Sequence, residues 1–422
     1  MSIWTVGVFF LLVIYIGTAK SVFRYKINAP VVIGLAWAPA LYLASLGVEF
    51  TSPVYSHLSN QNIVLSYTII FIAFIFVFFG YTLGCHNKSI TNKDLVLTGP
   101  LMNLHLLFWA VLSLYAYIIL ESNVVLAWAT RMLPTEVLEH RQNLHIGTIN
   151  HLILGLNFLA ANYLIIFMQS KKKVYLVPLL LVFLAHAATL QKSAIIGFVL
   201  QIFFVSVLSE TFTANFHRRK VFGWVAAAVL GLGLVLLLLR TNEIRGIGLD
   251  QMTNLSTTSE QLFIYLGGPA IINFSATLNG DLPWVDLSGL LMFQSFAWIL
   301  GGREMFAVTK YLEGINNGTA LMYWWADMGL FGIMLHSTIL GFVVGKLQLW
   351  AKNNMLMLYF SALSYQFLGM SVFTESLYQP TTVLIVFNVF ALQILLNLRI
   401  RAASQRKSPN VTGGQTSHWR GR

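Results

Sequence analysis

Two arginines close together follow directly on a long apolar run. The run ends at Arg240 in the stretch LLLLRTNEIRGIGL (236–249), and Arg245 follows with Glu243 between them. A guanidinium group keeps its charge when partly buried and binds a phosphate or carboxylate through two parallel hydrogen bonds. The pair therefore indicates an anion site at the end of an apolar helix. Two alternatives stay open: Arg240 extends its guanidinium group to the lipid head groups at a helix end, or the arginines form ordinary ion pairs within the loop.

A second group of residues has the chemical types that move protons. Glu139 and His140 lie in PTEVLEHRQNLH (134–145), where a helix would place Glu136 beside both. A carboxylate or an imidazole here could take the proton of an acceptor hydroxyl, although a solvated helix face explains the same pattern. Asp327, in YWWADMGLFG (323–332), is a further candidate base. If it is buried in an apolar segment, it needs an arginine or a helix-terminus donor as its partner.

Three histidines fall inside apolar segments, where an ionisable side chain marks a possible functional site. These are His151, His186 and His336. A histidine packed against a neighbouring helix is the alternative for each of them. We favour His186, because it lies close to Gln191 and Lys192 at the end of an apolar segment. The candidate set also contains Arg303 as a catalytic residue, and four residues that we expect to bind substrate: Arg131, Arg141, Tyr265 and Tyr323.

The composition indicates whether these residues belong to a soluble protein or to a membrane protein. The chain of 422 residues is 57% hydrophobic and only 10% charged, whereas soluble domains carry about 25% charged residues. It is therefore an integral membrane protein. The single cysteine, Cys85, excludes an internal disulfide framework. The net charge of +11 indicates basic cytoplasmic loops rather than nucleic-acid binding.

Apolar runs of about 20 residues predict membrane-spanning helices. We expect an all-α polytopic protein with about eleven such helices, near 3–19, 30–48, 63–85, 101–120, 148–169, 174–190, 194–209, 221–239, 322–345, 354–373 and 379–398. Most of the 26 Lys and Arg residues then fall on one side, which the positive-inside rule makes cytoplasmic. The N-terminus is outside and the C-terminus inside. The outer side nevertheless keeps several basic residues: Arg131, Arg141, Lys192, Arg240, Arg245, Arg303 and Lys310.

Two long outer loops hold most of the candidate residues. The first covers about 121–147 and the second about 240–321, which is much longer than the usual connection between helices. The apolar parts of the second loop are interrupted by Gly267, Gly268, Pro269 and Pro283, which predicts interfacial or re-entrant helices or two further spans. Residues 1–400 form one membrane domain, and the basic tail 401–422 is expected to be disordered.

The sequence lacks the motifs of several common kinds of binding site. No phosphate-binding loop, dinucleotide fingerprint or zinc pattern occurs. We therefore expect no cofactor, no metal and no nucleic-acid partner. Matched broken helices in two repeated halves, which are typical of transporters, are also missing from the sequence.

The late part of the chain resembles a known family. The stretch NNGTALMYWWADMGLFGIMLHSTILGFVVGKL (316–347), together with RTNEIRG (240–246) and YLGGPAIINF (265–274), resembles the Wzy-type polymerases of O-antigen and related repeat-unit glycans. In motif terms this resemblance covers about 240–345. Some members carry an arginine, ten residues and a glycine in each outer loop. Arg303 and Gly314 fit that spacing, but the first loop has no such pair, and its role is therefore open.

The resemblance implies a fold and a reaction. The fold is that of the polytopic glycosyltransferases that use lipid phosphosugars, placed in the bacterial inner membrane with the active site facing the periplasm. Growing glycan on undecaprenyl pyrophosphate is transferred to a sugar hydroxyl of another lipid-linked repeat unit, without a metal. Arg240, Arg245 and Arg303 would stabilise the leaving pyrophosphate, while Glu139, His140 or Asp327 would supply the base.

The resemblance also implies partners, and it leaves other functions open. The partners are the lipid-linked oligosaccharide, the lipid bilayer and a chain-length-regulating co-polymerase. An O-antigen ligase shares the fold and the donor, but ligases tend to have a His-rich outer motif that this chain lacks. A flippase of lipid-linked oligosaccharide is the other alternative, and it predicts charged residues along a path through the spans.

Overall fold

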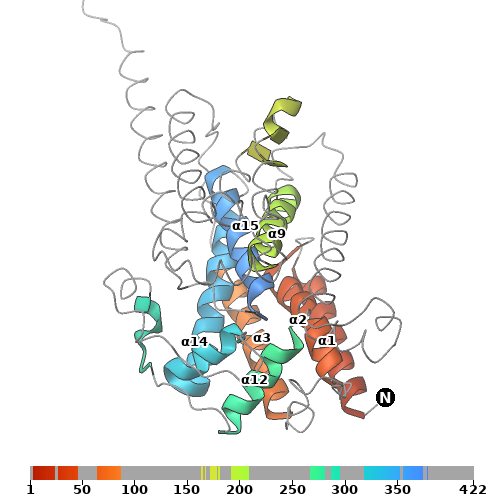
Figure 1. Cartoon of the computed structure of the whole chain (residues 1–422), viewed down its shortest axis with the longest axis vertical. Coiled ribbons are helices and arrows are strands. Elements are labelled where there is room, and N and C mark those ends of the chain that lie inside the picture. The colour runs from red at the N-terminus through yellow and green to blue at the C-terminus, as the bar shows by residue number, and fades with distance from the viewer. Residues whose placement is uncertain are drawn as a thin grey trace, which may run out of the picture.

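The computed structural model describes a helical bundle (Figure 1). The described residues are 3–23, 27–45, 64–86, 163–164, 167, 172–177, 179–180, 192–208, 267–280, 287–294, 318–351, 355–373 and 378. Within these ranges every regular element is helical and no strand occurs, as the predicted class requires. The elements are α1 (Ile3–Val22), α2 (Ala29–Ser45), α3 (Val64–Cys85), η2 (Lys173–Tyr175), α9 (Lys192–Leu208), α12 (Gly268–Leu278), η5 (Leu290–Phe293), α14 (Ala320–Ala351) and α15 (Met355–Met370).

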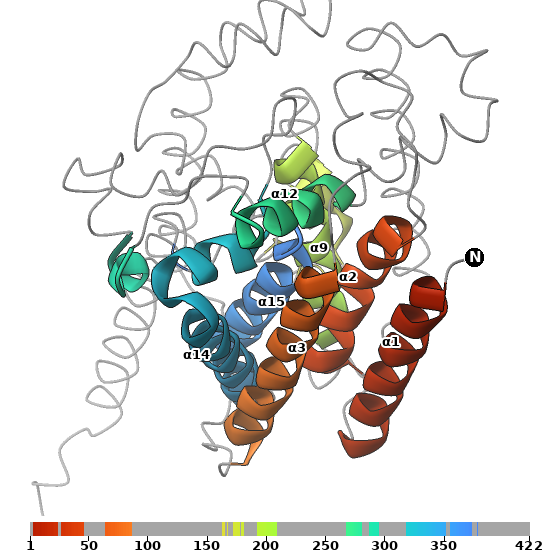
Figure 2. The same cartoon turned by 90° about the horizontal axis from the view of Figure 1, so that it is seen from below.

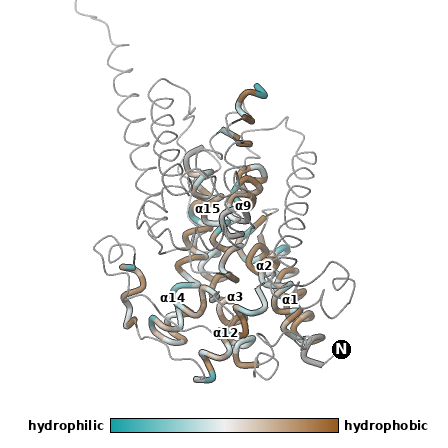
Figure 3. Tube along the Cα trace, viewed as in Figure 1, coloured by the Kyte–Doolittle hydropathy of each residue, from teal (hydrophilic) through white to brown (hydrophobic). Residues whose placement is uncertain are grey.

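Two of the described helices are long and apolar enough to cross a membrane. They are α3, with 22 residues, and α14, with 32 residues. Large apolar side chains such as Ile75 (60% exposed), Phe79 and Phe331 lie on the outside of these helices, and hydrophobic residues extend along the bundle (Figure 3). Exposed apolar surface of this kind is unfavourable in water and favourable in lipid.

The described helices coincide with a part of the predicted spans. Helices α1, α2, α3, α9, α14 and α15 lie on the spans predicted near 3–19, 30–48, 63–85, 194–209, 322–345 and 354–373. The predicted spans at 101–120, 148–169, 174–190, 221–239 and 379–398 lie wholly or partly outside the described residues. The same is true of the first outer loop and of the C-terminal tail.

Helices α3 and α14 pack along each other in the same direction through paired glycines. A Cβ atom added to Gly80 of α3 would overlap the carbonyl oxygen of Thr338, and one added to Gly84 would overlap that of Phe342. In return, Gly341 of α14 lies against Val77, and Gly345 lies against Tyr81. Residue numbers rise together along the two helices, so they are parallel. Small residues four apart are the usual means of bringing helix backbones close in lipid.

A cluster of buried polar side chains connects several helices near the C-terminal end of α14. The side-chain oxygen of Gln348 accepts hydrogen bonds from the hydroxyls of Tyr81 and Tyr365. The side-chain amide of Gln348 donates to the carbonyl of Ile27, 3.0 Å away. These bonds join α3, α14, α15 and the turn before α2. Asn28 then begins α2, because its side chain accepts the backbone N–H of Val31.

Helix α12 is short and buried. It has 11 residues, or about 16 Å at 1.5 Å per residue, and the hydrocarbon core of a bilayer is about 30 Å thick. Residues 268–277 are all buried, and α12 packs against α2, α3 and α14 (Figure 2). This segment of the second predicted outer loop is therefore neither a full span nor a helix with one face open to solvent.

Candidate functional site

The site is built on a break in α14. The helix is regular up to Asp327, and then Met328 (φ −149°, ψ 32°) and Gly329 (φ 57°, ψ −138°) leave helical geometry before the helix resumes. The conformation of Gly329 is one that side chains with a Cβ atom adopt only under strain. The break therefore needs a glycine at this position. It divides α14 into a short first part, which ends in a carboxylate, and a long second part.

A turn from the preceding loop satisfies the carbonyl groups that the break leaves open. The backbone N–H of Leu287 donates to the carbonyl of Ala326 (2.8 Å), and that of Gly289 donates to the carbonyl of Asp327 (3.2 Å). The N–H of Leu291, at the start of η5, donates to Asp327 Oδ1 at 3.0 Å. The turn thus holds both the backbone and the side chain of Asp327. In an apolar surrounding, such unpaired groups would each be costly.

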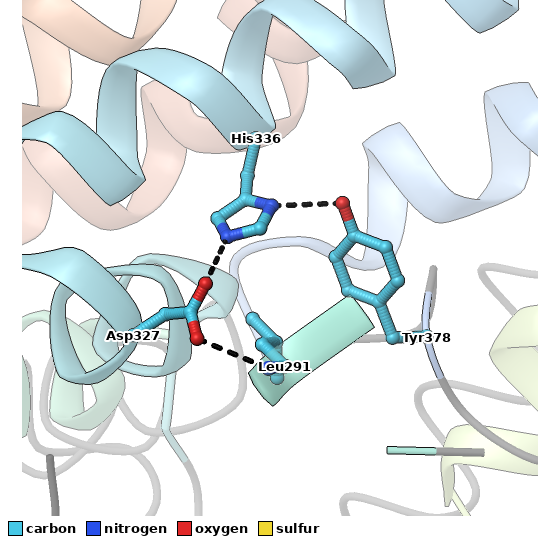
Figure 4. Close-up of polar contacts among 4 residues, drawn as sticks. All are labelled: Leu291, Asp327, His336 and Tyr378. Carbon is cyan, nitrogen blue, oxygen red and sulfur yellow. Dashed lines mark hydrogen bonds and ion pairs between the residues drawn. The ribbon is translucent and has the colours of Figure 1, made fainter. Parts of the chain in front are cut away.

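Three side chains form a line of hydrogen bonds at the break (Figure 4). Asp327 Oδ2 lies 2.8 Å from His336 Nε2, and His336 Nδ1 lies 2.8 Å from the hydroxyl oxygen of Tyr378. The side chains of Asp327 and His336 have no solvent exposure. The ring of Trp324 lies beside the imidazole, with centroids 6.0 Å apart. Two parts of α14 and the segment after α15 therefore meet at one point.

The partners of Asp327 fix the direction of these bonds. One oxygen of Asp327 accepts from Leu291 and the other faces His336. A carboxylate can only accept hydrogen bonds, so we assign the imidazole proton to Nε2, which donates it. Nδ1 is then the basic nitrogen, and it accepts the hydroxyl hydrogen of Tyr378. An imidazole held in this tautomer by a buried carboxylate is arranged to take up a proton at the other nitrogen. The carboxylate stabilises the imidazolium that results.

The structure describes two of the residues selected from the sequence. Asp327 receives a helix-terminus donor from Leu291, which is one of the partners expected for it, and its side-chain partner is His336 rather than an arginine. Tyr323 lies in the first part of α14, one turn before Asp327, and is half-buried against the hydrophobic core. The others lie outside the described residues: Arg131, Glu139, His140, Arg141, Arg240, Arg245, Tyr265 and Arg303.

The sequence marks His336 as one of three histidines in apolar segments but does not single it out, and it gives no indication of Tyr378. We favoured His186, which lies outside the described residues. In an uninterrupted helix with 3.6 residues per turn, Asp327 and His336 would point in opposite directions, about 13.5 Å apart along the axis. Only the break at Gly329 brings them together. The run DMGLFG, with an acidic residue just before two glycines in an apolar segment, is the signal that could have indicated it.

No metal site accompanies these residues. Among the described residues, no group of three or more His, Cys, Asp and Glu side chains is arranged to hold a metal ion. Searches of protein-family models, of curated proteins and of solved structures found no match to the chain.

Proposed function

We propose that the protein is a glycosyltransferase of the bacterial inner membrane that polymerises lipid-linked oligosaccharide repeat units. The donor is growing glycan on undecaprenyl pyrophosphate, and the acceptor is a sugar hydroxyl of another lipid-linked repeat unit. The observation that carries the proposal is the buried line Asp327–His336–Tyr378 at a break in an apolar helix. Such a transfer must remove a proton from a hydroxyl, and the middle member of this line is an imidazole with one nitrogen placed to accept a proton.

The direction of the helices supports the topology that the proposal needs. With about eleven spans and an N-terminus outside, α3 and α14 both run from the outer to the inner face. Their parallel packing through Gly80, Gly84, Gly341 and Gly345 fits that arrangement. Asp327 then lies near the outer end of α14, next to the second outer loop. A donor and an acceptor on lipid carriers would reach it from the periplasmic leaflet.

The outer arginines supply the other half of the reaction. As the acceptor oxygen bonds to the anomeric carbon of the donor, the bond from that carbon to pyrophosphate breaks, and negative charge develops on the leaving group. We assign Arg240, Arg245 and Arg303 to this charge, because preorganised guanidinium groups stabilise it most effectively. The pyrophosphate bond of the donor provides the driving force. A chain-length-regulating co-polymerase is the proposed protein partner.

The proposal is tested on the surface glycan of the native bacterium. The gene is deleted and then complemented with the wild type, with Arg245→Ala, with His336→Asn or with Tyr42→Phe. Tyr42 lies on the exposed side of α2 (38% exposed) and serves as a control for membrane insertion. We expect glycan limited to a single repeat unit in the deletion strain. The ladder of longer chains should return with the wild type and Tyr42→Phe, and not with the other two variants.

Other outcomes would replace the proposal with a different function. Long polymer that remains on the lipid carrier and is absent from the core lipid would indicate a ligase. Repeat units retained on the cytoplasmic face would indicate a flippase. A ladder unchanged by the deletion, in a strain without a second polymerase gene, would refute polymerisation of that glycan.

A further inference from the structure

We propose that Tyr378 is a catalytic residue: its hydroxyl contacts the acceptor hydroxyl and passes the proton on to His336. This inference rests on the proposed function, and it names the group of the site that meets the substrate. If His336 took the proton directly from the acceptor, Tyr378 would only pack against the imidazole. The geometry of the site points to the relay instead.

Neither nitrogen of His336 is open to a substrate. Nε2 is 2.8 Å from Asp327 Oδ2, and Nδ1 is 2.8 Å from the Tyr378 hydroxyl oxygen. Both Asp327 and His336 are fully buried, whereas Tyr378 is only partly buried. Of the three side chains, Tyr378 is therefore the one that retains exposed surface. A proton that leaves the acceptor enters the line of hydrogen bonds through its hydroxyl.

The phenol ring is held in the position that a relay needs. Its centroid lies 5.2 Å from that of the His336 ring, and the two planes meet at 71°. The segment that carries Tyr378 follows a turn at 371–373, which is fixed at two points. Trp37 Nε1 donates to Ser371 Oγ at 2.8 Å, and the backbone N–H of Ala320 donates to the Ser371 carbonyl at 2.9 Å. The start of α14 and the turn at 371–373 are therefore held together.

The step balances without a further reactant. The acceptor oxygen forms a bond to the anomeric carbon of the donor, and the bond from that carbon to the pyrophosphate oxygen breaks. The acceptor proton moves to the Tyr378 oxygen while the phenolic hydrogen moves to His336 Nδ1, so Tyr378 is unchanged at the end. The imidazolium is stabilised by Asp327. It later loses its proton to the released pyrophosphate or to water.

The first test is Tyr378→Phe in purified protein reconstituted with lipid-linked repeat units. Phenylalanine keeps the ring and removes only the hydroxyl. We expect the single-turnover rate of glycan transfer to fall about 10²- to 10⁴-fold, which is the usual contribution of a positioned proton-transfer group. The acceptor concentration that gives half the maximal rate should change less than threefold. Tyr42→Phe is the matched control and should react at the wild-type rate. A Tyr378→Phe rate within threefold of wild type would overturn the inference.

The second test does not depend on how well the variant folds. The wild-type single-turnover rate is measured in mixtures of H₂O and D₂O. A relay moves two protons in one step, so the rate should fall along a curve as the deuterium fraction rises. A straight line in the wild type would mean that one proton moves, and it would overturn the relay while leaving polymerisation intact. If the wild type forms no polymer at all under these conditions, the proposed function fails and the inference fails with it.

Discussion

Replacing Asp327 with asparagine should separate catalysis from stability. The carboxylate accepts two hydrogen bonds, from Leu291 N–H at 3.0 Å and from His336 Nε2 at 2.8 Å. In Asp327→Asn, the amide oxygen still accepts from Leu291, and the amide nitrogen donates to Nε2 if the imidazole moves its proton to Nδ1. Nδ1–H then donates to the Tyr378 oxygen. Every hydrogen bond is kept, but the direction of the line is reversed.

The reversed line no longer takes up a proton. Because Nδ1 is already protonated, we expect the transfer rate to fall about 10²- to 10⁴-fold. The free energy of unfolding should change by less than about 1 kcal/mol, since the bonds are replaced and the volume is conserved. Asp327→Ala is different, because it leaves two buried donors without an acceptor. At about 1–3 kcal/mol for each donor, it should cost about 2–6 kcal/mol of stability as well as activity.

The assay combines single-turnover transfer in proteoliposomes with thermal unfolding of the same preparations in detergent. The reasoning predicts a slow but stable Asp327→Asn variant beside a slow and unstable Asp327→Ala variant. An Asp327→Asn variant that reacts within threefold of wild type would refute the assignment of the tautomer. Equal destabilisation in both variants would refute the reversal of the hydrogen bonds.

Three further changes test the framework around the site, each by thermal unfolding in detergent. Gly329→Ala should destabilise the protein by about 1–3 kcal/mol, because a Cβ atom strains the conformation at the break; a neutral result would mean that the break is not as described. Gly341→Ala should cost about 1–3 kcal/mol by separating α3 from α14, whereas Gly17→Ala, with open space around it, should cost nothing; equal effects would contradict the close packing. Gln348→Leu should lower the free energy of unfolding by about 2–6 kcal/mol, because it removes the acceptor of two buried tyrosine hydroxyls. The transfer rate of the folded variant should nevertheless stay within threefold of wild type, because Gln348 lies about 18 Å along the helix from His336.

The helical class and several helix positions follow from the sequence for a simple physical reason. A long apolar run must be helical in lipid, because its backbone polar groups have no other partners, and the described helices α1, α2, α3, α9, α14 and α15 lie on such runs. The close packing of α3 and α14 also has a signal in the sequence. GYTLG (80–84) and GFVVG (341–345) each place two glycines four residues apart within an apolar segment, which is a known signal of close helix packing.

The site itself was only partly predictable. Asp327 stood out, because a carboxylate in an apolar segment is costly and needs partners. Tyr378 did not stand out, and His336 was only one of three histidines in apolar segments, because their contact depends on two features that no periodicity encodes. One is the break at Gly329, which turns Asp327 toward His336. The other is the contact of Tyr378, which follows α15 in the sequence, with Nδ1 of the imidazole.

Reconstitution of the purified protein tests the central claim most directly. Proteoliposomes receive one lipid-linked repeat unit, with no nucleotide and with a metal chelator present, and the products are separated by length. We predict a ladder of chains longer than the added unit, which is lost in His336→Asn and kept in Tyr42→Phe. A ladder of equal intensity in His336→Asn would contradict the role of the buried line, and a wild-type protein that leaves the repeat unit unchanged would contradict polymerisation.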